Sequence, residues 1–409
     1  MLTRDRAVSP PQKKATAAII LSAFLVLSCA SLAQAQTISA PYSAVLPCDF
    51  VESLEFNGTN ANASITEQVE LGPRTTGSNG SAALRTIIHA QLPQWDVTNN
   101  TYTEDNITFT NVVATFAPEG TNESTPRVVL VAHYDSRDVA ERDPDVNRTM
   151  DPIPGANDAA SGVAVLLELG RIIPFMNLDY EVELLFTDAE DQNYSSGSLY
   201  GAKAWVNAQS EGQVNRTTAF VVVDMVGDEF LQLTHVYPGD VALWTTIAPL
   251  ASALGLMDTK EDCNGNLGRD IVNLSISTGV IDDHVPALNR GIHAIDLIDI
   301  RFGEGAEPFE GYWHTHEDTP DKVRAESLRD VGLLVELGLR SEAWIYDFQS
   351  LEEPEGDSSQ LDDNVQDLNE EEMEVERYTG LGVTALIGVL GAMVLMVVLS
   401  LSVNLKREQ

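Results

Sequence analysis

Short apolar runs alternate with amphipathic stretches through the middle of the chain, and each run ends in polar residues. The runs that predict strands cover 128–132, 182–186, 219–223 and 294–298, and 162–173 has the pattern of a helix. Wholly apolar strands that alternate with helices are typical of a parallel sheet buried on both faces. The pattern therefore predicts an α/β fold with a mostly parallel sheet and helices on both faces.

The N-terminus has the order of a secretory signal. Basic residues are followed by the apolar run 17–27 and by Ala33-Gln34-Ala35, a small-x-small cleavage site. We expect a signal peptide over 1–35 and a catalytic domain over 36–350. A short N-terminal membrane anchor is the alternative.

The C-terminus predicts a membrane anchor. Segment 351–378 is strongly acidic, which favours a disordered stalk, and 379–403 is apolar and long enough for one transmembrane helix. The basic pair Lys406-Arg407 lies in the last segment, 404–409, which we expect to be a cytoplasmic tail. The expected location is the cell membrane, with a single pass and an extracellular catalytic domain.

Charge and cysteine content narrow the possible partners. The formal net charge of −38 argues against binding nucleic acid. Cys48 and Cys263 remain after removal of a signal peptide, and they could pair in an oxidising compartment. Asn-x-Ser/Thr sequons are frequent, which suits an external glycoprotein; they begin at Asn57, Asn62, Asn79, Asn99, Asn106, Asn122, Asn147, Asn193, Asn215 and Asn273.

Histidines and carboxylates gather where the expected strands end. They are His133, Asp158, Glu190, Asp191, Asp224 and His314. Each alone has an ordinary explanation: Asp158 as a helix cap, His133 as a core histidine, Glu190-Asp191 as a solvated turn and His314 as a surface residue. Ligands of open α/β sheets bind beyond the carboxyl ends of the strands, so we expect these residues to converge on a site suited to zinc.

The motifs around these residues resemble one enzyme family. HYDSR at His133, GANDAASG around Asp158, LLFTDAED around Glu190, VVVDMVGD around Asp224 and WHTHEDT at His314 are similar to the zinc aminopeptidases and glutaminyl-peptide cyclotransferases. GPRTTGS at 72–78 also matches, and the resemblance spans about 70–345 in the family's order. It implies a mixed sheet flanked by helices.

The resemblance implies a role for each residue. Asp158, Asp191 and His314 would hold the zinc common to both branches of the family, and His133 and Asp224 would complete a second zinc site in the aminopeptidases. Glu190 matches the general base. Asp191 departs from the pattern, because many relatives carry Glu there.

The branch is decided by fewer residues. Segment 280–299, with Asp282 as a second catalytic carboxylate, and Trp313 as a substrate-binding wall resemble the cyclases, whereas the surroundings of Asp158 resemble the peptidases. Asp282-Asp283 as a loop cap and Trp313 as a core aromatic are the ordinary alternatives. We expect a glutaminyl-peptide cyclotransferase with one zinc, acting on peptide or protein N-termini. The alternatives are an aminopeptidase with two zincs and, from another class, a non-catalytic metal-binding ectodomain.

Overall fold

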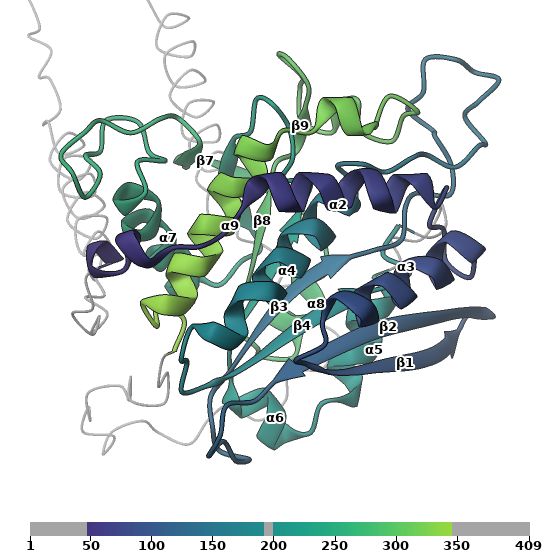
Figure 1. Cartoon of the computed structure of the whole chain (residues 1–409). Coiled ribbons are helices and arrows are strands. Elements are labelled where there is room, and N and C mark those ends of the chain that lie inside the picture. The colour runs from purple at the N-terminus through teal and green to yellow at the C-terminus, as the bar shows by residue number, and fades with distance from the viewer. Residues whose placement is uncertain (1–46, 192–198, 346–409) are drawn as a thin grey trace, which may run out of the picture. The chain divides into compact units, whose positions relative to one another are not determined.

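The computed structural model describes residues 47–191 and 199–345 (Figure 1). All of them belong to the first of two units into which the chain divides, Met1–Phe348. The expected signal peptide, stalk, membrane segment 379–403 and tail 404–409 lie outside the described residues.

A six-stranded sheet forms the centre of the fold, in the order β1-β2-β4-β3-β5-β8. Strands β4, β3, β5 and β8 run parallel, whereas β1 and β2 add antiparallel pairs at one edge. The bounds are β1 Asp96–Glu104, β2 Ile107–Phe116, β3 Arg127–His133, β4 Glu181–Thr187, β5 Thr217–Asp224 and β8 Ala294–Ile298. The four predicted strands and the mixed, mostly parallel sheet are therefore confirmed.

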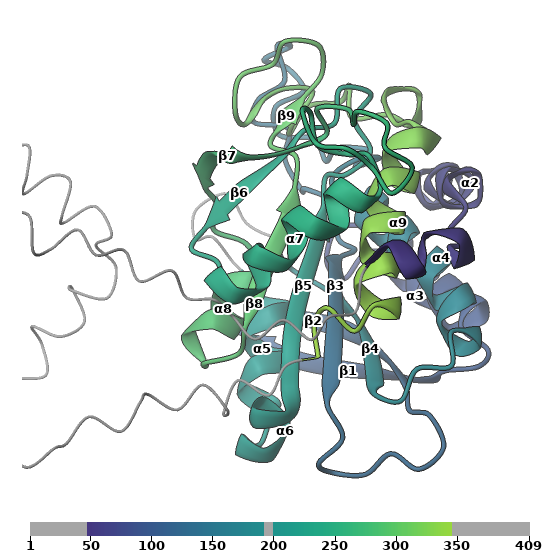
Figure 2. The ribbon, with the colours of Figure 1, turned by 90° about the vertical axis from the view of Figure 1, so that its left-hand side faces the viewer.

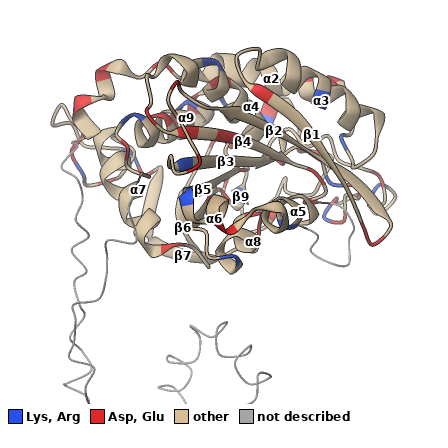
Figure 3. Ribbon diagram, turned by 90° about the horizontal axis from the view of Figure 1, so that it is seen from below, with Lys and Arg blue, Asp and Glu red and all other residues tan. Residues whose placement is uncertain are grey.

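Helices cover both faces of this sheet (Figures 2 and 3). One face carries α2 Gly58–Glu70, α3 Asn79–Gln91, α4 Ala160–Ile172 and α9 Ala325–Arg340. The other carries α5 Tyr200–Ala208, α6 Glu211–Arg216 and α8 His284–Asn289. The central strands β3 and β5 are thereby buried on both faces, which explains why the runs 128–132 and 219–223 show no polar alternation.

Helix α4 packs closely against the sheet and thereby positions the polar loop that precedes it. Almost every residue of α4 is buried, and Gly162 lets it approach β5 closely. A Cβ atom at Gly162 would lie 2.1 Å from the carbonyl oxygen of Val223. The loop that carries Asp158 is therefore held above the ends of β3 and β5.

Smaller elements complete the domain. Helix α7 Val241–Ala253 packs against α9, and β6 Leu233–Tyr237 pairs in parallel with β7 Val272–Gly279. The remaining elements are β9 Arg301–Phe302, β10 Glu310–Gly311, η1 Pro47–Asp49, η2 Val51–Ser53, η3 Ile173–Phe175 and η4 Pro320–Lys322. A disulfide joins Cys48 in η1 to Cys263, in the segment that follows α7, with a Cα–Cα distance of 5.5 Å.

The expected transmembrane helix requires a correction. Among residues 47–191 and 199–345, no helix is long and apolar enough to cross a membrane. The fold class is therefore corrected to a mixed α/β fold of the described residues; segment 379–403, where the membrane helix was expected, lies outside them.

Candidate metal centre and active site

Each predicted site residue stands at the carboxyl edge of the sheet or in a loop above it. His133 and Asp224 are the last residues of β3 and β5. Glu190 and Asp191 follow β4, and Asp158 lies two residues before α4. Parallel strands place these ends side by side, so residues far apart in the sequence meet.

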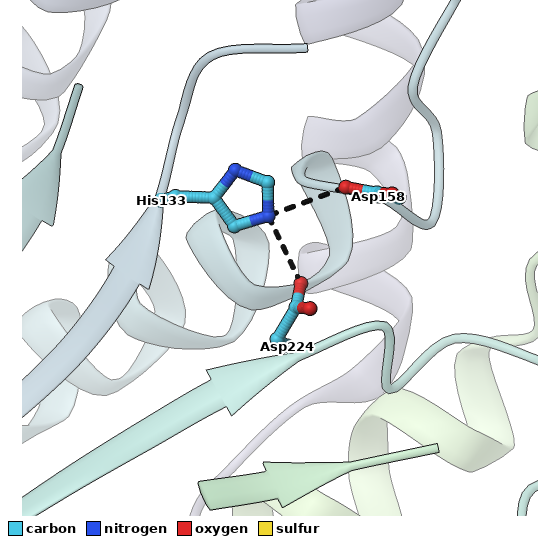
Figure 4. Close-up of side chains that lie close together, drawn as sticks. All are labelled: His133, Asp158 and Asp224. Atoms are coloured by element: carbon cyan, nitrogen blue, oxygen red, sulfur yellow. Dashed lines mark hydrogen bonds and ion pairs between the residues drawn. The ribbon is translucent and has the colours of Figure 1, made fainter. Parts of the chain in front are cut away.

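The first group consists of His133, Asp158 and Asp224 (Figure 4). Nε2 of His133 lies 3.2 Å from Oδ1 of Asp158 and 3.2 Å from Oδ1 of Asp224. All three residues are buried, with exposed fractions between 3% and 7%. Three donor atoms therefore converge on one point above β3 and β5.

The second group consists of Asp158, Asp191 and His314. Nε2 of His314 lies 3.5 Å from Oδ2 of Asp158 and 3.5 Å from Oδ1 of Asp191. Asp158 thus presents one oxygen to each histidine. Asp158 would therefore contribute to a metal held by either group.

The other ring nitrogen of each histidine is engaged outside the two groups. Nδ1 of His133 lies 3.1 Å from the carbonyl oxygen of Asp135, and Nδ1 of His314 lies 2.7 Å from Oε1 of Glu141. A partner of this kind fixes the ring and the tautomer, so that Nε2 carries the lone pair a metal needs. His133 and His314 are therefore neither ordinary core nor surface histidines.

Buried carboxylates also hold the loops that carry the ligands. The Asp135 carboxylate accepts hydrogen bonds from the backbone N–H groups of Glu190 and Asp191, both at 3.1 Å. Asp318 accepts from the backbone N–H of Asp158 at 3.2 Å. The N-cap of α4 is Ala159, and no side chain caps it. The ordinary explanations of Asp158 as a helix cap and of Glu190-Asp191 as a solvated turn are wrong.

The electrostatics of the site favour a bound cation. Burial, together with the neighbouring Asp158 and Asp282, raises the pKa of Asp224 to about 7, although His133 opposes the shift. Burial lowers the pKa of His133, but the carboxylates of Asp224, Asp135 and Asp158 outweigh it and hold that pKa well above its usual value. The negative charge of the buried carboxylates therefore exceeds the positive charge that the neighbouring side chains supply.

A further observation shows that these residues suit a bound metal. Oδ2 of Asp191 is buried and has no hydrogen-bond partner among the described residues. A buried carboxylate oxygen without a partner is costly unless a cation binds it. Imidazole nitrogens and carboxylate oxygens are a donor set that zinc accepts.

A pocket of about 270 Å³ opens over both groups and includes Glu190, Asp282 and Trp313 in its wall. Desolvation and the charges of Asp191 and Asp282 hold the pKa of Glu190 well above its usual range. Asp282 is buried, and Asp283, the N-cap residue of α8, does not cap the helix through its side chain. The structure therefore brings the predicted base and the second predicted carboxylate into one cavity.

Trp313 forms a flat part of this pocket. Its ring stacks on that of His314, with centroids 3.6 Å apart, and Phe309 packs beside it at 5.2 Å. Trp313 is partly buried and packs against the hydrophobic core, and it also lines the pocket. The ring both lines the cavity and supports a candidate metal ligand.

Three further residues of the site were missed at the sequence level. Asp296 in β8 is fully buried, and burial and the nearby Asp282 hold its pKa well above the usual range. An aspartate in the otherwise apolar run 294–298 is a signal that could have found it. Arg137 and Glu141 also line the pocket; Arg137 lies within HYDSR, but no pattern singles out Glu141.

Comparisons with known proteins agree with this geometry. The model of the family described as "Peptidase family M28" matches residues 111–337. The aminopeptidase YwaD of Bacillus subtilis is 27% identical over 232 residues, which cover 56% of this chain and 44% of YwaD. The glutaminyl-peptide cyclotransferase of Drosophila melanogaster is 25% identical over 312 residues, covering 69% and 82%.

A solved structure extends the likeness to the fold. The glutaminyl cyclase of an Acidobacteriales bacterium is 27% identical, with a TM-score of 0.58, and the match covers 70% of this chain and 94% of that one. The chain thus spans most of the cyclases that it matches but less than half of YwaD.

Proposed function

We propose that this chain, which belongs to peptidase family M28, is a zinc-dependent glutaminyl-peptide cyclotransferase. The observation that carries the proposal is the position of Asp282 in the pocket wall, with Glu190 and beside both metal-binding groups. The likeness to the cyclases of Drosophila melanogaster and of the Acidobacteriales bacterium supports it. The substrates are peptides or proteins that begin with glutamine.

The metal would be held by the two groups described above. Asp158, Asp191 and His314 would hold one zinc ion, and His133 and Asp224 would complete a second site through Asp158. When bound, zinc polarises the carbonyl group under attack. The side chains of the pocket supply the remaining steps.

Glu190 acts as the proton carrier. It accepts a proton from the α-amine of the substrate while the amine nitrogen forms a bond to Cδ of the glutamine side chain. The bond between Cδ and the amide nitrogen then breaks, and Glu190 returns the proton to that nitrogen. The products are ammonia and a pyroglutamyl peptide. The raised pKa of Glu190 suits a group that must both take and return a proton.

Asp282 and Trp313 assist this transfer. The charge of Asp282 raises the pKa of both Glu190 and Asp224, so a proton in this cluster is shared rather than fixed on one group. The Trp313 ring offers a flat apolar wall against which the short glutamine side chain packs.

One observation favours a second function. Both metal-binding groups are complete, and the likeness to YwaD points to an aminopeptidase. In that reaction Glu190 would take a proton from the attacking water and pass it to the leaving amine. A non-catalytic metal-binding ectodomain is not favoured, because every expected ligand and Glu190 are present in the pocket.

Two substrates separate these functions. The purified domain is incubated with a peptide that begins with glutamine and, separately, with leucine anilide. A cyclase releases ammonia from the peptide and leaves the anilide intact. An aminopeptidase releases the aniline and frees N-terminal residues.

We further propose that the domain works outside the cytoplasm. The disulfide between Cys48 and Cys263 supports export, because oxidising compartments preserve such bonds. Sequons such as Asn106, at the exposed turn between β1 and β2, are accessible to glycosylation. Intact mass spectrometry of the protein from its source tests both points, through an N-terminus at Gln36 and through added glycan mass.

A further inference from the structure

Arg137 connects two acidic residues beside the second metal-binding group. Its Nη1 atom lies 3.0 Å from Oδ1 of Asp191 and 3.3 Å from the carbonyl oxygen of the same residue. Its Nη2 atom lies 2.9 Å from Oε1 of Glu141, and its Nε atom lies 3.3 Å from Oε2. The guanidinium group thus donates hydrogen bonds to both the side chain and the backbone of Asp191.

Glu141 continues the connection to the second ligand. Its Oε1 atom lies 2.7 Å from Nδ1 of His314, whose Nε2 atom faces Oδ1 of Asp191 at 3.5 Å. Asp191, Arg137, Glu141 and His314 therefore form a closed ring. Two ligands that are distant in sequence are tied together by a pair of residues that lie outside the group.

Asp191 has a particular need for such support. Its side chain is short, so the position of its oxygens follows closely from the position of its backbone. Arg137 occupies Oδ1 and the backbone oxygen, whereas Oδ2 is buried without a hydrogen-bond partner among the described residues. Oδ1 is engaged by Arg137 and also faces Nε2 of His314 at 3.5 Å, so Arg137 fixes the oxygen that lies nearest the other ligand.

We propose that Arg137 is a positioning residue that fixes the carboxylate of Asp191 for metal binding, and that Arg137 and Glu141 together set the zinc affinity of the Asp158–Asp191–His314 group. The inference rests on the proposed use of zinc. It adds two residues of this chain that act through the ligands.

Two effects of Arg137 oppose each other. A cation beside a ligand repels a metal ion, but the Glu141 carboxylate, 2.9 Å from Nη2, offsets that charge. The ordering of Asp191 and His314 remains as the larger effect. Partners of this kind typically change metal affinity by about 10–100-fold.

The test measures Zn²⁺ affinity directly, by competition with a chromophoric chelator. Arg137→Leu should weaken the binding of one ion by about 10–100-fold. Arg137→Lys, which keeps the charge but loses the planar fork, should lie between Arg137→Leu and the unmodified protein. Arg148→Leu, an exposed arginine on the same loop, is the matched control and should bind Zn²⁺ normally.

A double substitution separates ordering from general damage. Because Arg137 and Glu141 belong to one ring, Arg137→Leu with Glu141→Gln should cost less affinity than the two single effects combined. If Arg137→Leu does not fold, Arg137→Lys decides, and it must still weaken Zn²⁺ binding.

Unchanged or tighter Zn²⁺ binding in folded Arg137 variants, or an equal loss in Arg148→Leu, overturns the inference. The affinity measurement does not depend on turnover. If the unmodified protein binds Zn²⁺ with this Arg137 dependence but cyclises no peptide, the inference stands and the proposed function fails.

Discussion

One carboxylate oxygen of Asp158 lies 3.2 Å from Nε2 of His133. The other faces His314, so a single side chain belongs to both metal-binding groups. This relationship makes Asp158 unlike the other ligands, each of which serves one group.

Asp158→Asn should therefore lower metal binding at both groups, whereas Asp224→Asn should affect its own group alone. An amide keeps the size of the side chain but loses the charge and one acceptor. Metal analysis of the purified variants, per mole of folded chain, measures the difference. Equal zinc content in Asp158→Asn and the unmodified protein would remove Asp158 from the centre.

Removal of metal should abolish activity. Dialysis against a strong chelator should leave a folded, inactive protein, because the pocket side chains alone do not polarise the substrate carbonyl. Added Zn²⁺ should restore turnover. Full turnover in a sample verified as metal-free would contradict the role assigned to zinc.

Glu190→Gln should slow turnover by about 10²–10⁴-fold without loss of zinc, since Glu190 moves a proton and binds no metal. Asp191→Asn should lose zinc as well as activity. Glu119→Gln, an exposed glutamate, is the control and should behave like the unmodified protein. A metal-free Glu190→Gln beside a metal-loaded Asp191→Asn would mean that the roles of the two adjacent carboxylates are reversed.

Asp299 should make the folded state less stable as the pH rises. Burial raises its pKa to about 7, although it accepts backbone N–H groups from Gln232 and Arg301, each at 2.9 Å. The unfolded chain has a pKa of about 4 at this residue, so the folded state binds more protons between these values. The contribution of Asp299 to the free energy of unfolding is complete below about pH 4 and is lost as the pH rises through about 7.

Asp299→Asn should remove that part of the pH dependence. Denaturant unfolding of both proteins at several pH values between 4 and 8 measures it. An identical slope against pH in the two proteins would show that Asp299 is ionised normally in the folded state.

The sequence predicted the elements that are buried on both faces. The runs 128–132 and 219–223 are wholly apolar, so the strands that end at His133 and Asp224, and the convergence of their ends, were predictable from the sequence. Strand β1 was missed because most of its residues are exposed and polar. Its pairing with β2 depends on the tertiary fold rather than on a local pattern.

The site was predictable where residues lie in recognisable motifs. Glu141 was not, because its partner His314 is 173 residues away and the loop between them carries no regular pattern. The pairing of Cys48 with Cys263 was left open for the same reason, and the structure forms that bond. The membrane helix expected over 379–403 does not belong to the described fold, in which no helix is long and apolar enough to cross a membrane.

Asp282→Asn distinguishes the two candidate reactions within one protein. A cyclase that shares a proton among Glu190, Asp224 and Asp282 should lose most of its turnover, with zinc content unchanged. Hydrolysis by an aminopeptidase has less need of this carboxylate. Near-normal turnover in the folded variant would exclude Asp282 from the reaction.

The most direct test of the account is the stoichiometry of ammonia release from a peptide that begins with glutamine. The zinc-loaded domain should release one ammonia for each peptide converted, and the peptide should become about 17 Da lighter, by the loss of NH₃ in the ring closure. Release of free glutamine and a shortened peptide, without ammonia, would contradict the cyclase function and establish the aminopeptidase.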